Sequence, residues 1–121
     1  MLTLPSQITC GYFDSSEFGT LRISPKRTAT KFEIEFYLED ASSTFADDAV
    51  YTIRKGYVQI AVPGQVRYSH LPFKTMYVKF CADGELAERL QTAPPYFKST
   101  PPSSVLLPCL ITYALSSCLF A

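Results

Sequence analysis

Hydrophobic and polar residues alternate most regularly between residues 31 and 39. One face of this segment is apolar, with Phe32, Ile34, Phe36 and Leu38, and the other carries Glu33, Glu35, Tyr37 and Glu39. A period of two is typical of a β-strand with one buried side and one solvated side. We therefore expect a strand here whose apolar face packs in the core and whose glutamates face water.

Further short runs rich in β-branched and aromatic residues follow, separated by Gly, Pro, Asp and Ser. They predict strands at 49–54, 57–62, 65–69 and 75–81, with turns at 40–43 and 55–56. Pro63-Gly64 has the order that a type II turn prefers. In the last of these strands, Met76 and its alternate neighbours lie opposite Tyr77 and Lys79.

One short helix is predicted after these strands. Asp83 is a suitable N-cap, acidic residues occupy the first turn, and Leu86 and Leu90 share one face. The helix should end before Pro94-Pro95. Short strands followed by one small helix indicate a mainly β domain, either a sandwich or a small barrel. Its interior could hold a small molecule, or side chains alone could fill it.

Composition and charge exclude several function classes. The chain has 121 residues, which fit one compact domain, and its eleven basic and eleven acidic side chains cancel. A nucleic-acid binder needs a basic face, so we expect no direct nucleic-acid contact. The first eleven residues are mixed and uncharged, unlike a secretory signal, so a cytoplasmic location is expected.

Cysteine and histidine usage predicts neither a disulfide scaffold nor a metal site. Cys10, Cys81, Cys109 and Cys118 are few and widely spaced, and we interpret them as reduced thiols. His70 is the only histidine, and a lone histidine on a strand or turn is more often structural than a ligand. We assign no metal and no cofactor.

Enzyme motifs are also missing from the sequence. It has no Gly-rich phosphate loop, no nucleophile elbow and no second histidine to activate a nucleophile. Glu33 and Glu35 form a possible carboxylate pair, but two glutamates on a solvated strand face are better explained by ion pairs with Lys31 or Lys79. The sequence therefore predicts a protein without catalytic activity.

Arg67 is the leading candidate for a ligand contact. It alternates with apolar neighbours just after the Pro63-Gly64 turn, so it could point into a cavity and bind a carboxylate or a polyol. A surface position is the commoner outcome, because arginine is seldom buried. Tyr37, Tyr51 and Tyr77 could likewise line a pocket, although packing within strands explains most strand tyrosines.

A family resemblance appears over residues 8–98. It is carried by segments 18–27, 32–38, 53–60, 63–69 and 71–74, with the steps Arg54-Lys55-Gly56, Pro63-Gly64, Leu71-Pro72-Phe73-Lys74 and Tyr77-Val78-Lys79-Phe80. In this order the blocks resemble the N-terminal sensor domain of AraC-family transcription regulators. The resemblance implies a cupin-like small barrel, or double-stranded β-helix, with one or two short C-terminal helices.

The resemblance also implies a function and its residues. Such a domain binds a small-molecule effector, here a sugar or a carboxylate, and pairs as a homodimer, whereas a separate helix-turn-helix half binds DNA. That half is missing from this chain. Related sensors often place a histidine where Arg67 stands, which favours an inward role for Arg67. The further expected ligand contacts are Glu35, Tyr37, Tyr51 and Tyr77.

The chain is therefore expected to divide into a sensor domain at 1–98 and an uncharged tail at 99–121. The apolar part of the tail, residues 105–121, predicts a helix from about Pro108 that packs on the barrel or on a second subunit. A membrane anchor is less favoured, since basic flanking residues are missing, and a gene-boundary product is a third interpretation. The alternative functions are a stand-alone cupin-fold enzyme or small-molecule binder, and a tail-anchored interaction protein.

Overall fold

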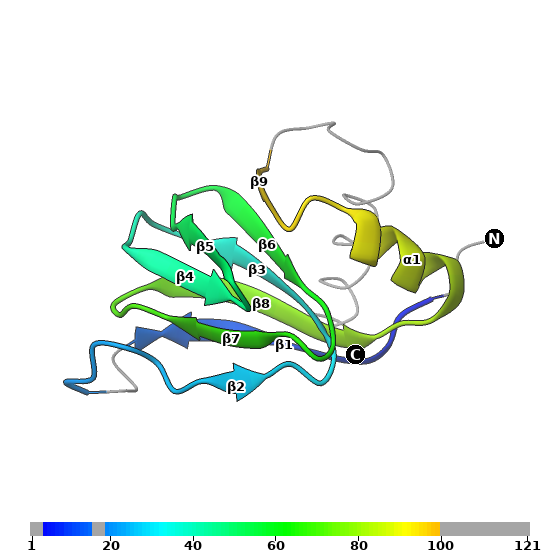
Figure 1. Cartoon of the computed structure of the whole chain (residues 1–121), viewed down its shortest axis with the longest axis horizontal. Coiled ribbons are helices and arrows are strands. Elements are labelled where there is room, and N and C mark those ends of the chain that lie inside the picture. The colour runs from blue at the N-terminus through cyan, green and yellow to red at the C-terminus, as the bar shows by residue number, and fades with distance from the viewer. Residues whose placement is uncertain (1–3, 16–18, 100–121) are drawn as a thin grey trace.

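The computed structural model describes residues 4–15 and 19–99, which form two antiparallel sheets and one helix (Figure 1). The five-stranded sheet contains, in spatial order, β1 (Ser6–Asp14), β8 (Lys74–Cys81), β3 (Phe32–Tyr37), β6 (Tyr57–Ala61) and β9 (Tyr96–Lys98). The four-stranded sheet contains β2 (Arg27–Thr28), β7 (Val66–Ser69), β4 (Ser43–Ala46) and β5 (Ala49–Thr52). Helix α1 (Gly84–Thr92) follows β8.

The mainly β fold predicted from the sequence is confirmed, but a closed barrel is not. Within the described segments, neither sheet closes on itself, and the two open sheets face each other as a sandwich. Strand β2 has two residues and pairs with β7 alone, so it does not join the four-stranded sheet to β1. One helix is present in this part of the chain.

The main apolar core lies on the outer face of the five-stranded sheet, the face turned away from the other sheet. The strand residues that alternate toward this side pack against Leu86 and Leu90 of α1. The cluster contains Phe32, Ile34, Val58, Ile60, Val78, Phe80, Leu86 and Leu90. Spacing the two leucines four residues apart puts them on one helix face, so α1 covers the sheet as the sequence predicted.

The opposite face of β3 corrects the sequence prediction. Glu33 and Glu35 do lie opposite the apolar residues, but their exposed fractions are only 3% and 8%. Both sides of β3 are therefore buried, because the four-stranded sheet covers the polar side. Lys31, one of the expected partners, instead donates a hydrogen bond to the carbonyl of Gln7 at 3.3 Å.

The Pro63-Gly64 turn and the two ends of α1 lie where the sequence predicts them. Gly64 has a φ of 91°, and the N–H of Gln65 donates to the carbonyl of Val62 at 3.2 Å, as a type II turn requires. Asp83 occupies the N-cap of α1, but its side chain makes no capping hydrogen bond. The helix ends at Thr92, before the two prolines.

Four strands were not predicted. Strand β4 begins within the expected turn and pairs with β5 through the two-residue connection Asp47-Asp48. The turn after β4 is bonded to β7, since the N–H of Asp47 donates to the carbonyl of Val66 at 2.8 Å. Strands β1, β2 and β9 were also missed, because each is either short or interrupted by polar residues.

Of the four cysteines, only Cys10 and Cys81 lie in the described residues. Cys10 on β1 is disulfide-bonded, which corrects the predicted reduced thiol at this position, whereas Cys81 is free. Apart from Ser99, the tail lies outside the described residues, and so does every prediction about it. No helix in the described part of the chain is long and apolar enough to cross a membrane.

If α1 supplies the cover of the outer face, Leu86→Ala should lower the free energy of unfolding by about 2–5 kcal/mol, because it opens a cavity in a fully buried site. Urea denaturation followed by circular dichroism measures the change. The control is Leu21→Ala, at an exposed leucine, which should leave stability nearly unchanged. Equal effects of the two substitutions would contradict this packing.

Candidate functional site

The inner face of the five-stranded sheet, which is turned toward the other sheet, is unusually polar. In the antiparallel register, Glu35 on β3 lies between Tyr77 on β8 and Gln59 on β6. Two residues before Glu35 on the same strand, Glu33 lies opposite Lys79 on β8. Side chains of directly paired residues share a face, so these five residues project toward the four-stranded sheet.

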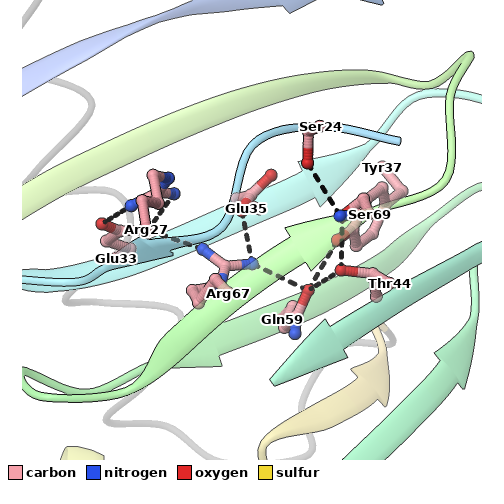
Figure 2. Close-up of polar contacts among 9 residues, drawn as sticks. All are labelled: Ser24, Arg27, Glu33, Glu35, Tyr37, Thr44, Gln59, Arg67 and Ser69. Atoms are coloured by element: carbon pink, nitrogen blue, oxygen red, sulfur yellow. Dashed lines mark hydrogen bonds and ion pairs between the residues drawn. The ribbon is translucent and has the colours of Figure 1, made fainter. Parts of the chain in front are cut away.

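Two arginines of the four-stranded sheet project toward these residues. Arg27 on β2 and Arg67 on β7 are directly paired, and both reach across to the glutamates of β3 (Figure 2). Arg67 is only 4% exposed, so its side chain points inward and does not lie on the surface. Its NH1 lies 2.6 Å from Glu33 Oε1 and its NH2 lies 2.5 Å from Glu35 Oε1.

Arg27 completes the pairing from the rim of the site. Its two terminal nitrogens each donate to one oxygen of Glu33 at 2.7 Å, a bidentate geometry. Glu33 thus accepts hydrogen bonds from both arginines, whereas Glu35 pairs with Arg67 alone. The Arg27 side chain is 45% exposed, so the network runs from the solvent into the interior.

These contacts set the ionisation of the network. Burial would raise the pKa of Glu33, but the hydrogen bond from Arg27 and the charge of Arg67 outweigh it and hold that pKa below its ordinary value. Burial would lower the pKa of Arg67, but the negative charge of Glu35 and the other neighbours outweighs burial, so that pKa is raised above its ordinary value. Both groups are therefore charged at neutral pH.

Gln59 connects this charge network to a second set of polar groups. Its Oε1 accepts from Arg67 NH2 at 3.0 Å and from the Tyr37 hydroxyl at 2.6 Å (Figure 2). Thr44 on β4 lies within 3.4 Å of the same oxygen and also pairs with the Ser69 hydroxyl at 2.8 Å. Burial is the main reason that the pKa of Tyr37 is raised, so its hydroxyl remains a donor.

A cavity of about 280 Å³ lies beside the charge network, between the two sheets. Residues of both sheets and of the loops before β2 and β8 line it: Phe13, Ser24, Pro25, Arg27, Glu33, Glu35, Arg67, Tyr68, Ser69, Phe73, Thr75, Tyr77 and Lys79. The apolar part of the wall includes Phe13 and Phe73, whose ring centroids are 4.6 Å apart. The cavity thus combines aromatic surface with fixed polar groups, the usual make-up of a small-molecule site.

Two buried polar atoms in the residues that line the cavity have no hydrogen-bond partner. They are Nε of Arg67 and Oγ1 of Thr75. Leaving a buried polar group unsatisfied costs about 1–3 kcal/mol, so such groups are rare unless something else satisfies them. Both atoms are enclosed by protein, so a molecule in the cavity does not reach them in this conformation.

The structure brings three of the five predicted contact residues to the cavity. Arg67, Glu35 and Tyr77 line it. Tyr37 lies outside the lining, and its hydroxyl donates a hydrogen bond to Gln59 of the network. Tyr51 does not belong to the site: its ring stacks on Tyr96 at 5.0 Å, at the edge formed by β5 and β9.

Sequence reasoning missed several residues of the site. The sequence analysis placed Glu33 on the same face as Glu35 but interpreted both as solvated, whereas Thr75 lies two residues before Tyr77 on the inward face of β8 and follows from the same period of two. Arg27 and Phe13 lie on strands that were not predicted. Gly11, two residues before Phe13 on β1, leaves room for the ring of Tyr77, because a Cβ there would lie 2.6 Å from the tyrosine hydroxyl.

The arrangement offers hydrogen bonding and charge, with no sign of a metal centre. Among residues 4–15 and 19–99, no group of three or more His, Cys, Asp and Glu side chains could hold a metal ion. His70 lies 3.3 Å from the Ser42 hydroxyl and edge-on to Phe45. In comparisons with known proteins, no family model matches the chain and no curated protein is significantly similar to it.

Glu33→Gln should flatten the dependence of stability on pH. A carboxyl whose pKa is lowered in the folded state contributes stability above its unfolded pKa and loses it as the pH falls through the folded pKa. The ordinary pKa of a glutamate is about 4.3, so the wild type should lose stability more steeply than Glu33→Gln below about that pH. Urea unfolding from neutral pH to about pH 3 measures this.

The matched control for that experiment is Glu39→Gln, at an exposed carboxylate 3.9 Å from Lys74. Exposed pairs of this kind contribute little, so its pH profile should follow the wild type. A wild-type profile as flat as that of Glu33→Gln would contradict the assigned ion pairs.

Arg67→Met should lower the free energy of unfolding at neutral pH by about 3–5 kcal/mol, because it leaves Glu35 buried without a cationic partner. Arg22→Met, at an exposed arginine, is the control. Combining Arg67→Met with Glu33→Gln and Glu35→Gln should recover much of the loss, since the uncompensated charges are then gone. Failure of the triple variant to exceed the single variant would show that the charges are not the cause.

Proposed function

We propose that the chain is the effector-sensing and dimerising domain of an AraC-type transcriptional regulator. In this proposal a small molecule binds in the cavity between the two sheets. The observation that carries it is the buried guanidinium of Arg67, which lies in the lining of the cavity together with Glu33 and Glu35.

The cupin-like fold is part of the same proposal. Its support is the pair of facing antiparallel sheets, together with the Pro63-Gly64 turn that directly precedes the strand carrying Arg67. Dimerisation and the regulator class rest on the resemblance of residues 8–98 to this family. A regulator works in the cytoplasm, where disulfides are uncommon, so the Cys10 disulfide counts against that location.

Binding is a better explanation of the charged interior than stability is. Buried ion pairs are often no more stabilising than apolar residues of similar size, because desolvation offsets their attraction. The main apolar core with α1 lies on the other side of the five-stranded sheet. The charged groups between the sheets thus lie apart from that core, and we assign them to ligand recognition.

The proposed mechanism is a shift in population between two arrangements of the domain. A ligand on Arg67 would act on Gln59, which shares a hydrogen bond with Arg67 and is paired with Tyr96 of β9. Tyr37 forms a second connection, because its ring lies 6.2 Å from that of Tyr96. Strand β9 is the last described strand, so it could pass the change to the segment that follows.

Nuclear magnetic resonance tests this proposal with the full chain. Adding sugars, polyols, carboxylates and amino acids in turn should reveal a class that shifts the backbone amides of Arg67, Thr75 and Tyr77, which line the cavity. The amides of β9 should shift as well if the signal leaves the site through Gln59. Shifts only at surface residues, or none with any class, would overturn the proposed function.

A further inference from the structure

We infer that Cys10 is bonded to a cysteine of the C-terminal tail, Cys109 or Cys118, and that this disulfide holds the apolar tail against the outer face of the five-stranded sheet. The inference concerns an interaction surface and its occupant, and it is independent of any ligand in the cavity. It follows from the state of the cysteines, the exposed apolar residues beside Cys10 and the composition of residues 100–121.

The first step concerns the partner of Cys10. Cys10 is disulfide-bonded, whereas Cys81 is free. The register agrees, because Cys10 pairs with Val78 of β8, and residues three apart on a strand point to opposite faces, so Cys81 lies on the other side of the sheet. Of the four cysteines in the chain, the two in the tail, Cys109 and Cys118, are left as partners within one molecule.

The second step concerns the surface around Cys10. Val78 belongs to the core that packs against α1, so Cys10, its direct pair, lies on the outer face as well. Two residues further along β1, Tyr12 pairs with Met76 on the same face, and their exposed fractions are 53% and 44%. Helix α1 thus covers one part of this face and leaves an apolar patch, formed by Tyr12 and Met76, beside Cys10.

The third step concerns the occupant of that patch. Residues 100–121 contain no charged side chain, and residues 105–121 are mostly apolar. An apolar segment of this length gains free energy when its side chains leave water for an apolar surface. A disulfide at Cys10 gives the segment a high effective concentration next to Tyr12 and Met76. The tail therefore matches the patch in chemistry and is held beside it.

The fourth step concerns reach. Strands β1 and β9 form opposite edges of the five-stranded sheet (Figure 1). Neighbouring strands are about 4.8 Å apart, so the two edges are separated by roughly 19 Å. The N–H of Ser99 donates to the carbonyl of Gly56 at 2.9 Å, which fixes the start of the tail beside β6. Cys109 follows Ser99 by ten residues, which span up to about 33 Å when extended, so both tail cysteines can reach Cys10.

Peptide mapping of the full chain, purified without reductant, tests the pairing. Trypsin places Cys10 in residues 1–22, Cys81 in residues 80–89 and both tail cysteines in residues 99–121. After alkylation of free thiols, we expect mass spectrometry to find 1–22 joined to 99–121, and 80–89 in alkylated form. The protein that yields the joined peptide should run as a monomer on a non-reducing gel.

Three results would overturn the pairing. They are recovery of 1–22 with an alkylated Cys10, a bond between 1–22 and 80–89, and a joined peptide that occurs only in a covalent dimer. The mapping uses the unaltered chain, so its result does not depend on the folding of a variant.

Hydrogen–deuterium exchange of the full chain tests whether the bonded tail packs on the sheet. In the wild type, the amides of residues 105–121 should exchange more slowly than those of an unstructured peptide. Met76→Gln makes the patch polar and should speed this exchange about fivefold, since the tail loses an apolar contact. The control is Val50→Gln, at an exposed valine of β5 in the other sheet, which should leave tail exchange unchanged.

Cys10→Ser separates the bond from the packing. It should speed the exchange of residues 105–121 at least as much as Met76→Gln does, because loss of the disulfide lowers the effective concentration of the tail at the patch. Cys81→Ser, which removes the free thiol, is its control and should exchange like the wild type. Tail exchange at the unstructured rate in the wild type, or equal rates in the wild type, Met76→Gln and Cys10→Ser, would overturn the docking.

Discussion

The ion pairs of Arg67 with Glu33 and Glu35 are the interaction on which the interior depends, because they join the two sheets. A buried guanidinium is tolerated only if its charge is matched with good geometry, and here two carboxylates on one strand provide that match. The long arginine side chain spans the gap between the sheets. The cavity lies beside these charged pairs.

This interior is possible because the apolar core lies elsewhere. Helix α1 covers the outer face of the five-stranded sheet, where alternating residues of β3, β6 and β8 are apolar. A smaller apolar cluster around Tyr37, Ile53 and Phe73 closes one part of the sandwich. The main apolar core and the charged network thus lie on different faces of the same strands.

The sequence predicted the residues of the site better than their surroundings. The period of two placed Glu35 and Tyr37 on one face of a strand, and that division of faces is correct. The predicted solvent exposure of that face was wrong, because a strand face with two glutamates is typical of a solvated surface. Only the facing sheet with its arginines shows that the glutamates are buried. Tyr51 failed for a similar reason: it lies on an inner face, but at the edge where β9, a strand that was not predicted, brings Tyr96 against it.

The sequence by itself determined the mainly β fold, the type II turn, the apolar cover of α1 and the alternation of each long strand, because these depend on neighbours a few residues apart. Only the tertiary structure decided that the glutamates are buried, that Arg67 reaches them, and that a cavity remains. Those facts depend on contacts between residues far apart in the sequence, such as Arg67 with Glu33 and Phe13 with Phe73, and a polar face is the same in sequence whether water or another sheet covers it.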